Sequence, residues 1–546
     1  MNWVNKNHPS QFNLIRAIDL ASRMVPAAAL AAALAACSFE PPLQVPPPPV
    51  TQSYVSGPET EKTVSTNGVG NAGVEQDLIY GAKIRADWWR LFSSEQIDGL
   101  VDAAVTHNPT IASSIASLDE SHEDLLAAAG IFWPQLTASG SAERERISGA
   151  QFGSQNSNEF SLYTGDVSVS YLPDIFGLNA MVYQASKAQE DAARYNLQEA
   201  YLTLEGNTVI TAIQAASLYD EIQTTQDLIK SQQDTLVILE NQYKAGAIDY
   251  LSVLNQQVAL ADTQSDLPPL EQSLAAADNA LAVLVGNIPS QAQLPVMSVQ
   301  TFRLPVKLPV SLPSILVEQR PDILSSEMQI RSANAQVGEA VAQRFPLVEI
   351  TGDIGYQSGK LYTLFDPSSL IWDAAADATV TVFDGGTLEA EQHAAEAALR
   401  LQENNYRSVV LNAFEQVANA LRAVQHDAET LQYDQQAYDA AVQGFDLAQR
   451  QYILGSINYL TLLTSQTQYQ RARLELVAAI AQRYEDTAAL FVALGGGWWP
   501  QQYNTDQQNA EEANSQTKTS PSAQGKNMIQ SVADNQSSSN PETPSR

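Results

Sequence analysis

Residues 452–466, YILGSINYLTLLTSQ, decide the fold because a second copy, YKAGAIDYLSVLNQQ, occupies residues 243–257. Seven of the fifteen paired positions are identical, and the copies lie 209 residues apart. In each copy a glycine follows a long proline-free segment and precedes another apolar one, the pattern of a helix that stops at the glycine and a second helix that returns. The chain is therefore expected to contain one helical hairpin twice.

The repeat extends well beyond the hairpins. Pro321 matches Pro109 at an offset of 212, and Gly386 matches Gly177 at an offset of 209. Each unit is expected to carry two strands with alternating faces, at about 134–147 and 159–172 in the first and at about 346–357 and 370–383 in the second. Long helices should follow at 177–245, roughly 100 Å at 1.5 Å per residue, and at 387–454. From Val410 to Phe445, mostly apolar residues recur at alternating spacings of four and three, which is typical of a coiled coil.

These patterns divide the mature chain into two repeats. The first spans 80–292, with its tip turn at about 246–250, and the second spans 293–500, with its tip turn at about 455–459. Pro268 and Pro269 lie in the return helix of the first repeat, where the second has Val477 and Ala478. Proline removes a backbone donor and clashes with the preceding turn, so the sequence predicts a break or kink there.

The N-terminus has the features of an export signal. Basic residues precede a short apolar run, and residues 34–37, LAAC, resemble the bacterial lipobox, which predicts a signal peptide at 1–36 and a diacylated Cys37. The alternative is an ordinary alanine-rich signal with an incidental cysteine. Ser38 follows where an aspartate would signal inner-membrane retention, which favours the outer membrane. A proline-rich and polar tether is expected at 37–79, and a disordered tail at 501–546.

The charge balance argues against a nucleic-acid partner. The chain carries 61 acidic and 29 basic residues, a formal net charge of -32, whereas phosphate binding needs clustered lysine and arginine. One G-x-G-x-x-G match, at Gly68, Gly70 and Gly73, lacks the preceding strand and following helix of a dinucleotide site. His122 lies among acidic residues, which is more typical of a solvated helix face than of a metal site. We expect no enzyme, no metal and no cofactor apart from the lipid on Cys37.

Four strands cannot close a barrel, and an open sheet edge cannot face lipid because its backbone polar groups would be unsatisfied. If the strands lie in a membrane, several chains must share one barrel, and three chains would supply twelve strands. The alternative is a water-soluble sheet that caps a helical bundle. The length of the helices favours the membrane reading, since it suits a tube that crosses the space between two membranes.

Several long motifs carry a family resemblance from about residue 80 to residue 499. They are DWWRLFSSEQIDGLVDAAVTHNPTI, LPDIFGLN, LPSILVEQRPDILSSEMQIRSANAQVGEA, RFPLVEITGDIG, VFDGGTLEAE and ALGGGW. In this order they resemble the TolC-like outer-membrane efflux proteins, in particular the lipidated branch that serves resistance-nodulation-division pumps. The resemblance implies an α+β membrane protein, a homotrimer with a shared twelve-stranded outer-membrane β-barrel and a periplasmic coiled-coil helical barrel. Its implied partners are outer-membrane lipid, a periplasmic adaptor and an inner-membrane pump.

The same resemblance assigns roles to residues at the helix turns. Gly246 and Gly455 match the tip glycines around which an adaptor docks, although the geometry of a turn would by itself select glycine. Leu460 matches the apolar member of the tip constriction. The family's acidic member falls on Thr464, and its first-repeat counterpart is Asn255, so the sequence departs from the pattern here. Asp249 is a further candidate for the constriction, but its counterpart is Asn458.

The sequence thus predicts a passive outer-membrane exit duct of a tripartite pump for drugs or other small toxic compounds, anchored by lipid and extending into the periplasm. The same architecture could serve type I protein secretion. A lipid-anchored structural coiled-coil protein without a pore is the alternative of a different class.

Overall fold

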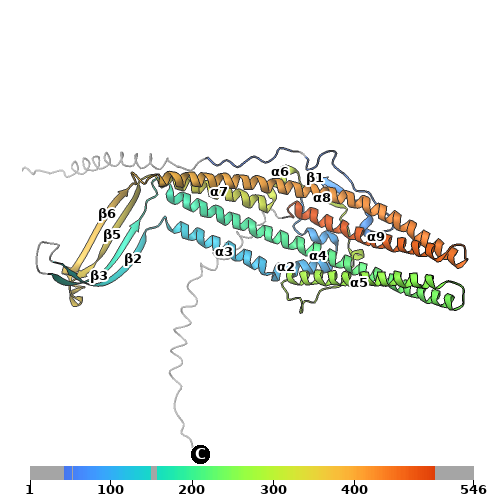
Figure 1. The fold of residues 1–546 in the computed structure, drawn as a ribbon. Coiled ribbons are helices and arrows are strands. Elements are labelled where there is room, and N and C mark those ends of the chain that lie inside the picture. Colours follow the sequence, from blue (N-terminus) through green and yellow to red (C-terminus); the bar gives the residue numbers. More distant parts are fainter. Residues whose placement is uncertain (1–41, 52, 149–156, 498–546) are drawn as a thin grey trace, which may run out of the picture.

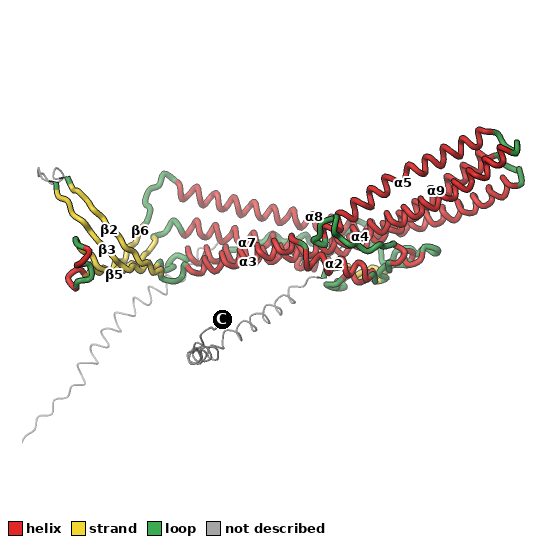
Figure 2. The backbone as a smooth tube through the Cα atoms, turned by 90° about the horizontal axis from the view of Figure 1, so that it is seen from below, coloured by secondary structure: helices red, strands yellow, loops and turns green. Residues whose placement is uncertain are grey.

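The computed structural model describes residues 42–51, 53–148 and 157–497. The predicted signal peptide, Cys37 and the predicted tail lie outside the described residues. The described chain is long and narrow, with a sheet at one end, two helical hairpins at the other and a belt of short elements between them (Figure 1). The two views agree on this arrangement (Figure 2).

The helical hairpins are equal in length. The first consists of α4 (Leu178–Lys244) and α5 (Tyr250–Leu284), and the second of α8 (Thr387–Ile453) and α9 (Tyr459–Ala493). Both long helices have 67 residues and both return helices have 35. At 1.5 Å per residue each long helix measures roughly 100 Å.

Of the break or kink predicted at Pro268 and Pro269, the break is wrong. Both prolines lie inside α5, which continues as one helix to Leu284. Consecutive prolines remove only two backbone donors, and an exposed helix can leave the freed carbonyls to water. The two carbonyls that lose a donor are those of Gln264 and Ser265, four residues before the prolines, and both residues are exposed. Packing of α5 along α4 supplies the remaining stability, as is usual for amphipathic helices.

The sheet is antiparallel, in the order β2-β3-β5-β6. Its strands are β2 (Gln135–Ile147), β3 (Asn158–Tyr171), β5 (Leu347–Ser358) and β6 (Leu370–Thr379). The last strand stops four residues short of the expected 370–383, because Thr379 pairs with Leu347, the first residue of β5. Beyond that pair no strand backbone is left for β6 to bond.

The register gives the sheet two different faces. One row across the four strands is Ala138, Val167, Ile354 and Trp372. The adjacent row on the opposite face is Thr137, Ser168, Asp353 and Asp373. Because successive side chains point to opposite faces, the sheet is apolar on one side and polar on the other, and both sides are solvent-accessible in a single chain.

Shorter helices connect the sheet to the belt. They are α2 (Glu95–His107), α3 (Pro109–Gly130), α6 (Pro313–Gln319) and α7 (Pro321–Ala342). Asn108 divides α2 from α3: its side-chain oxygen accepts from Thr110 N at 2.7 Å, and Pro109 occupies the first helical position. A proline there loses no helical hydrogen bond, so the Asn-Pro pair restarts the helix in a new direction.

The core is concentrated in the belt. Trp88, Phe92, Phe302, Tyr484 and Phe491 are all nearly inaccessible to solvent. Trp88 stacks on Phe491 with ring centroids 5.4 Å apart. A parallel pair of four-residue strands, β1 (Asp77–Tyr80) and β4 (Lys307–Val310), covers this core. No strand of this pair is expected from sequence, because four residues give too little alternation to detect.

In the part of the chain that the structure describes, no helix has both the length and the apolar character that crossing a membrane requires.

Candidate functional site

The two helix turns form the end of the molecule farthest from the sheet (Figure 1). Gly246 N donates to Tyr243 O at 2.8 Å, and Ala247 N donates to Gln242 O at 2.9 Å. Gly455 N and Ser456 N make the same two bonds in the second hairpin, to Tyr452 O and Gln451 O. This pair of bonds defines a Schellman motif, which needs a left-handed residue after the helix.

The backbone conformation favours glycine at both turns. Gly246 has φ +74° and Gly455 has φ +71°, and an added Cβ would meet no atom within 4 Å at either position. A non-glycine residue pays roughly 1–2 kcal/mol in this region. The left-handed backbone therefore favours glycine at both turns, and the open space around each turn leaves room for a partner.

Asp249 has a structural task at the first turn. Its Oδ1 accepts from Ser252 N at 3.1 Å and from the Ser252 hydroxyl at 2.6 Å, so it is the N-cap of α5. These hydrogen bonds hold the pKa of the Asp249 carboxyl below its usual range. Asn458 caps α9 in the same way through Thr461 N at 2.9 Å. Aspartate and asparagine serve about equally well as N-caps, because the side-chain oxygen of either accepts from the backbone N–H, which accounts for the difference between the copies.

The other candidate constriction residues lie in the first two turns of the return helices α5 and α9. Leu460 is 61% exposed. The Thr464 hydroxyl donates to the Leu460 carbonyl oxygen at 2.9 Å. The two side chains are four positions apart, so they lie on one face of α9. Asn255, on α5, is half-buried. The structure thus brings Leu460 and Thr464 together and places Asn255 on the neighbouring hairpin.

Polar contacts join the two hairpins within one chain. The Tyr452 hydroxyl donates to Gln242 Oε1 at 3.1 Å, and the Tyr459 hydroxyl donates to Gln256 Oε1. Gln256 is fully buried and donates in turn to Gln232 O at 2.9 Å. Below these bonds lies a small apolar cluster of Leu239, Val253, Ala448, Tyr459 and Leu462.

The corresponding tyrosines of the first hairpin lack such a covering. Tyr243 and Tyr250 face each other with centroids 5.1 Å apart, and they are 44% and 50% exposed. Tyr459, the counterpart of Tyr250, is 5% exposed. The same residue type at the same place in the repeat is thus covered in one copy and uncovered in the other.

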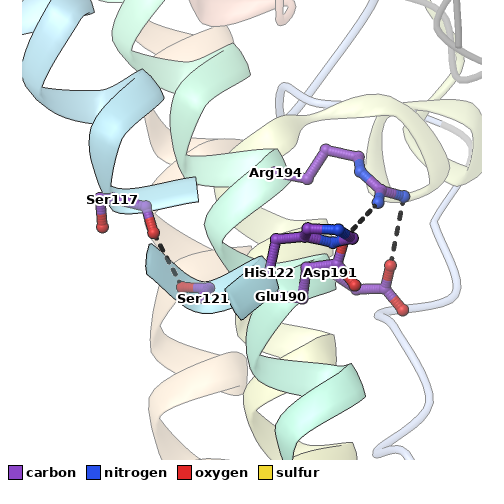
Figure 3. A network of polar contacts seen from close by, with 6 residues as sticks. All are labelled: Ser117, Ser121, His122, Glu190, Asp191 and Arg194. Carbon is purple, nitrogen blue, oxygen red and sulfur yellow. Dashed lines mark hydrogen bonds and ion pairs between the residues drawn. The ribbon is translucent and has the colours of Figure 1, made fainter. Parts of the chain in front are cut away.

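His122 joins a network of polar contacts rather than a set of metal ligands (Figure 3). Its Nδ1 lies 3.3 Å from Glu190 Oε1, which also accepts from Arg194 at 3.0 Å. Arg194 contacts Asp191 as well, at 3.3 Å. Within the described ranges, no group of three histidine, cysteine, aspartate or glutamate side chains is positioned to hold a metal ion.

Sequence reasoning missed Arg483 in the belt. It is fully buried and donates to Ala72 O at 2.6 Å, Val74 O at 2.7 Å and the Thr63 hydroxyl at 3.0 Å. Burial lowers the pKa of its guanidinium to about 10. The N-terminal segment that contains the glycine match is therefore fastened to α9, with a 3-10 turn at Gly70–Gly73. The sequence did contain a sign that this position differs between the repeats, because the first-repeat counterpart of the charged Arg483 is the apolar Leu274.

Two partly buried carboxyls of the belt have raised pKa values, and the first of them lies near Arg483. Burial, together with the neighbouring Asp486, raises the pKa of Asp427 to about 8. Burial also raises the pKa of Glu485 to about 7. These groups belong to the packing of the belt and lie far from the tip turns.

Comparison with known proteins places most of this chain in a known context. A model of the outer membrane efflux protein family matches residues 100–287 and 312–496. The chain is 28% identical over 470 residues to the cation efflux system protein CusC of Escherichia coli O6:H1, covering 86% of this chain and 97% of that protein. It is 24% identical to the probable outer membrane lipoprotein SilC of Salmonella typhimurium, covering 85% and 96%. The solved Campylobacter jejuni CmeC outer membrane channel has the same fold, with a TM-score of 0.77 at 20% identity over 86% of this chain and 98% of that one.

Proposed function

The chain belongs to the outer membrane efflux protein family, and on that premise we propose that it is the outer-membrane exit channel of a tripartite efflux pump. Members of this family are efflux channels rather than enzymes. The channel would act passively, as a water-filled duct through which a pump and an adaptor drive their cargo.

The two-faced sheet is the observation that carries this proposal. Its apolar row of Ala138, Val167, Ile354 and Trp372 suits contact with lipid, and the row with Asp353 and Asp373 suits a wet lumen. In the described part of the chain, β2 and β6 each have one edge that pairs with no strand. Free edges are not tolerated in lipid, and three copies would satisfy them by closing a twelve-stranded barrel.

The hairpins support a homotrimer independently. Three chains would arrange six hairpins in a ring, and the contact between the hairpins of one chain would recur between chains. Tyr250 would then be covered as Tyr459 is. The surface available for it is a groove between α8 and α9 of about 340 Å³, lined by small residues that include Ala441, Gly444 and Ser465. Ser465 is the repeat counterpart of Gln256, the partner of Tyr459.

This assembly gives each part of the chain a location. The sheet would lie in the outer membrane, and the helices of roughly 100 Å would form a periplasmic coiled-coil tunnel. The diacylated Cys37 would anchor the N-terminal tether in the same membrane. Similarity to a probable outer membrane lipoprotein supports this anchoring.

The tip turns are proposed to receive the periplasmic adaptor. Gly246 and Gly455 allow close approach because open space surrounds their Cα atoms. The inner-membrane partner would be a resistance-nodulation-division pump, and cargo would be small toxic compounds. Similarity to a cation efflux protein supports small solutes over secreted polypeptides. We further propose that Leu460 narrows the tip, with Thr464 and Asn255 lining it and Asp249 acting there only as a helix cap.

Conductance tests the channel. The purified full chain should form trimers by native mass spectrometry and should open ion-conducting pores in a planar lipid bilayer. A folded protein that inserts without conducting would refute the exit channel and favour a structural coiled coil.

Photo-crosslinking tests the tip. A photoreactive residue at position 246 or 455 should capture a periplasmic adaptor in cells that carry the complete pump.

An efflux assay of the variant Gly455→Asn tests close docking at the second turn. Asparagine tolerates the left-handed backbone and adds a side chain, so this variant should reduce efflux without loosening the turn. Normal efflux by this variant would argue against close docking there.

A further inference from the structure

The apolar face of the sheet ends abruptly on β2. Following every second residue, this face carries Leu136, Ala138, Gly140 and Ala142, and it then continues with Arg144 and Arg146. The two arginines lie toward the end of β2 that is farthest from α3 (Figure 1). Their side chains are 77% and 68% exposed.

The length of the apolar stretch indicates what surrounds these arginines. From Leu136 to Ala142 the strand rises roughly 20 Å, and from Val348 to Tyr356 on β5 it rises roughly 27 Å. Outer-membrane barrels have an apolar band about 25 Å tall, flanked by aromatic residues. At the far end of the band Tyr356 meets Phe365 edge to face, with centroids 5.6 Å apart. Arg144 therefore lies at the level of lipid headgroups on the side away from the helices.

A third cation joins the two arginines. Arg144 pairs with Ser161 on β3. The β3–β5 register ends at the pair Tyr163 and Ser358, and Lys360 lies two residues past it, with its ammonium over the Tyr362 ring, 5.6 Å from the ring centroid. A Cβ added at Gly359 would lie 3.6 Å from the Ser161 carbonyl oxygen, so the chain just before Lys360 lies beside the strand partner of Arg144. The backbone next to Lys360 is thus about two strand spacings, roughly 10 Å, from Arg144.

One acidic residue of the paired strands shares this part of the face. Glu159 lies opposite Arg146, and its carboxylate oxygens are 3.4 Å from a nitrogen of each arginine. Exposed ion pairs of this kind contribute about 0–1 kcal/mol. Glu143 and Glu145 alternate with the arginines, so they lie on the opposite face. Three cations against one carboxylate leave this patch with a net positive charge in a strongly acidic chain.

We propose that Arg144, Arg146 and Lys360 bind the phosphates of a phosphorylated glycolipid in the outer leaflet of the outer membrane. This inference rests on the proposed membrane location of the sheet. Guanidinium groups match phosphate with paired, charge-assisted hydrogen bonds, and the acyl chains of the same lipid would lie along Leu136 and Ala138. Continuity with the apolar band favours a lipid phosphate over a free one.

Lipid binding by the purified trimer tests the proposal. The wild-type protein in detergent is mixed with bisphosphorylated lipid A or with dephosphorylated lipid A, and bound lipid is counted by native mass spectrometry. The variant Arg144→Gln/Arg146→Gln/Lys360→Gln should bind bisphosphorylated lipid A at least tenfold more weakly. The matched control Arg400→Gln/Arg407→Gln removes exposed arginines from α8 and should bind it as the wild type does.

Three results would overturn the proposal. The first is equal retention of phosphorylated and dephosphorylated lipid by the wild type, and the second is undiminished binding by the triple variant. The third is full displacement of the lipid by millimolar inorganic phosphate, which would indicate a free-phosphate site. Planar-bilayer conductance of the same preparations separates this proposal from the channel itself, since a conducting triple variant that loses lipid supports both, and a non-conducting wild type refutes only the channel.

Discussion

Glu205 tests how burial affects the stability of the belt, because burial and not a neighbouring charge shifts the pKa of its carboxyl. It lies on α4 and is 3% exposed, and its Oε2 has no hydrogen-bond partner in the described structure. Burial raises the pKa of this carboxyl from 4.5 to about 8. Its repeat counterpart is Phe414, so the fold accepts an apolar side chain at the equivalent place.

The raised pKa of Glu205 determines how the free energy of unfolding changes with pH. Between pH 4.5 and about pH 8 the folded chain keeps a proton that the unfolded chain releases, so the free energy of unfolding falls as pH rises. The slope is about 1.4 kcal/mol per pH unit. From pH 5 to pH 7 this one group should therefore remove about 2.5 kcal/mol of stability per chain.

Glu205→Gln keeps the shape and removes the titration. The variant should exceed the wild type by about 3 kcal/mol at pH 7 and by under about 1 kcal/mol at pH 5. Guanidinium unfolding of the detergent-solubilised protein, followed by far-UV circular dichroism, measures the difference, with Glu415→Gln on the exposed face of α8 as the control. An equal gain at both pH values, or none, would show that Glu205 ionises freely in the folded chain.

Three further substitutions test the tip and the belt. Tyr459→Phe leaves the Gln256 oxygen buried without a donor, at a cost of about 1–3 kcal/mol; hydrogen exchange of the tip amides should accelerate about 5- to 150-fold, and an unchanged rate would contradict the contact. Gly455→Ala adds left-handed strain without a clash, so the same amides should exchange about 5- to 30-fold faster, whereas exchange as in the wild type would place no strain at this turn. Arg483→Met leaves the carbonyls of the N-terminal segment unpaired at a cost of about 3 kcal/mol or more; limited proteolysis should then cut between residues 60 and 76, and resistance there would show that the segment is held by other contacts.

The two tip turns could be predicted from the sequence because their backbone conformation depends on neighbouring residues. A glycine in the left-handed region, followed by an aspartate or asparagine cap, is specified within a few residues. The strands of the large sheet were accessible for the same reason, since alternation over ten or more residues leaves a clear pattern. The end of β6 was not, because it depends on where β5 begins, which is a tertiary fact.

The belt was harder to predict from the sequence because its residues contact partners that are hundreds of positions away in the chain. Gln76 donates to Pro305 O at 3.1 Å and to the Thr487 hydroxyl at 3.3 Å, and no local pattern predicts such bonds. The prolines in α5 misled for a related reason: the rule that proline interrupts a helix describes an isolated helix, whereas α5 is held along its length by α4.

The differences between the two copies indicate where the chain is asymmetric. A large difference in charge between equivalent buried positions of a duplicated unit indicates that their surroundings differ. Leu274 and Arg483 are equivalent, and only the second receives the carbonyl oxygens of Ala72 and Val74. A buried arginine is costly unless its donors are satisfied, so its presence in one copy implies that the N-terminal segment covers that copy. Three chains in a ring would then carry this covering on every second hairpin, giving a belt of threefold symmetry around a tube whose tips approach sixfold symmetry.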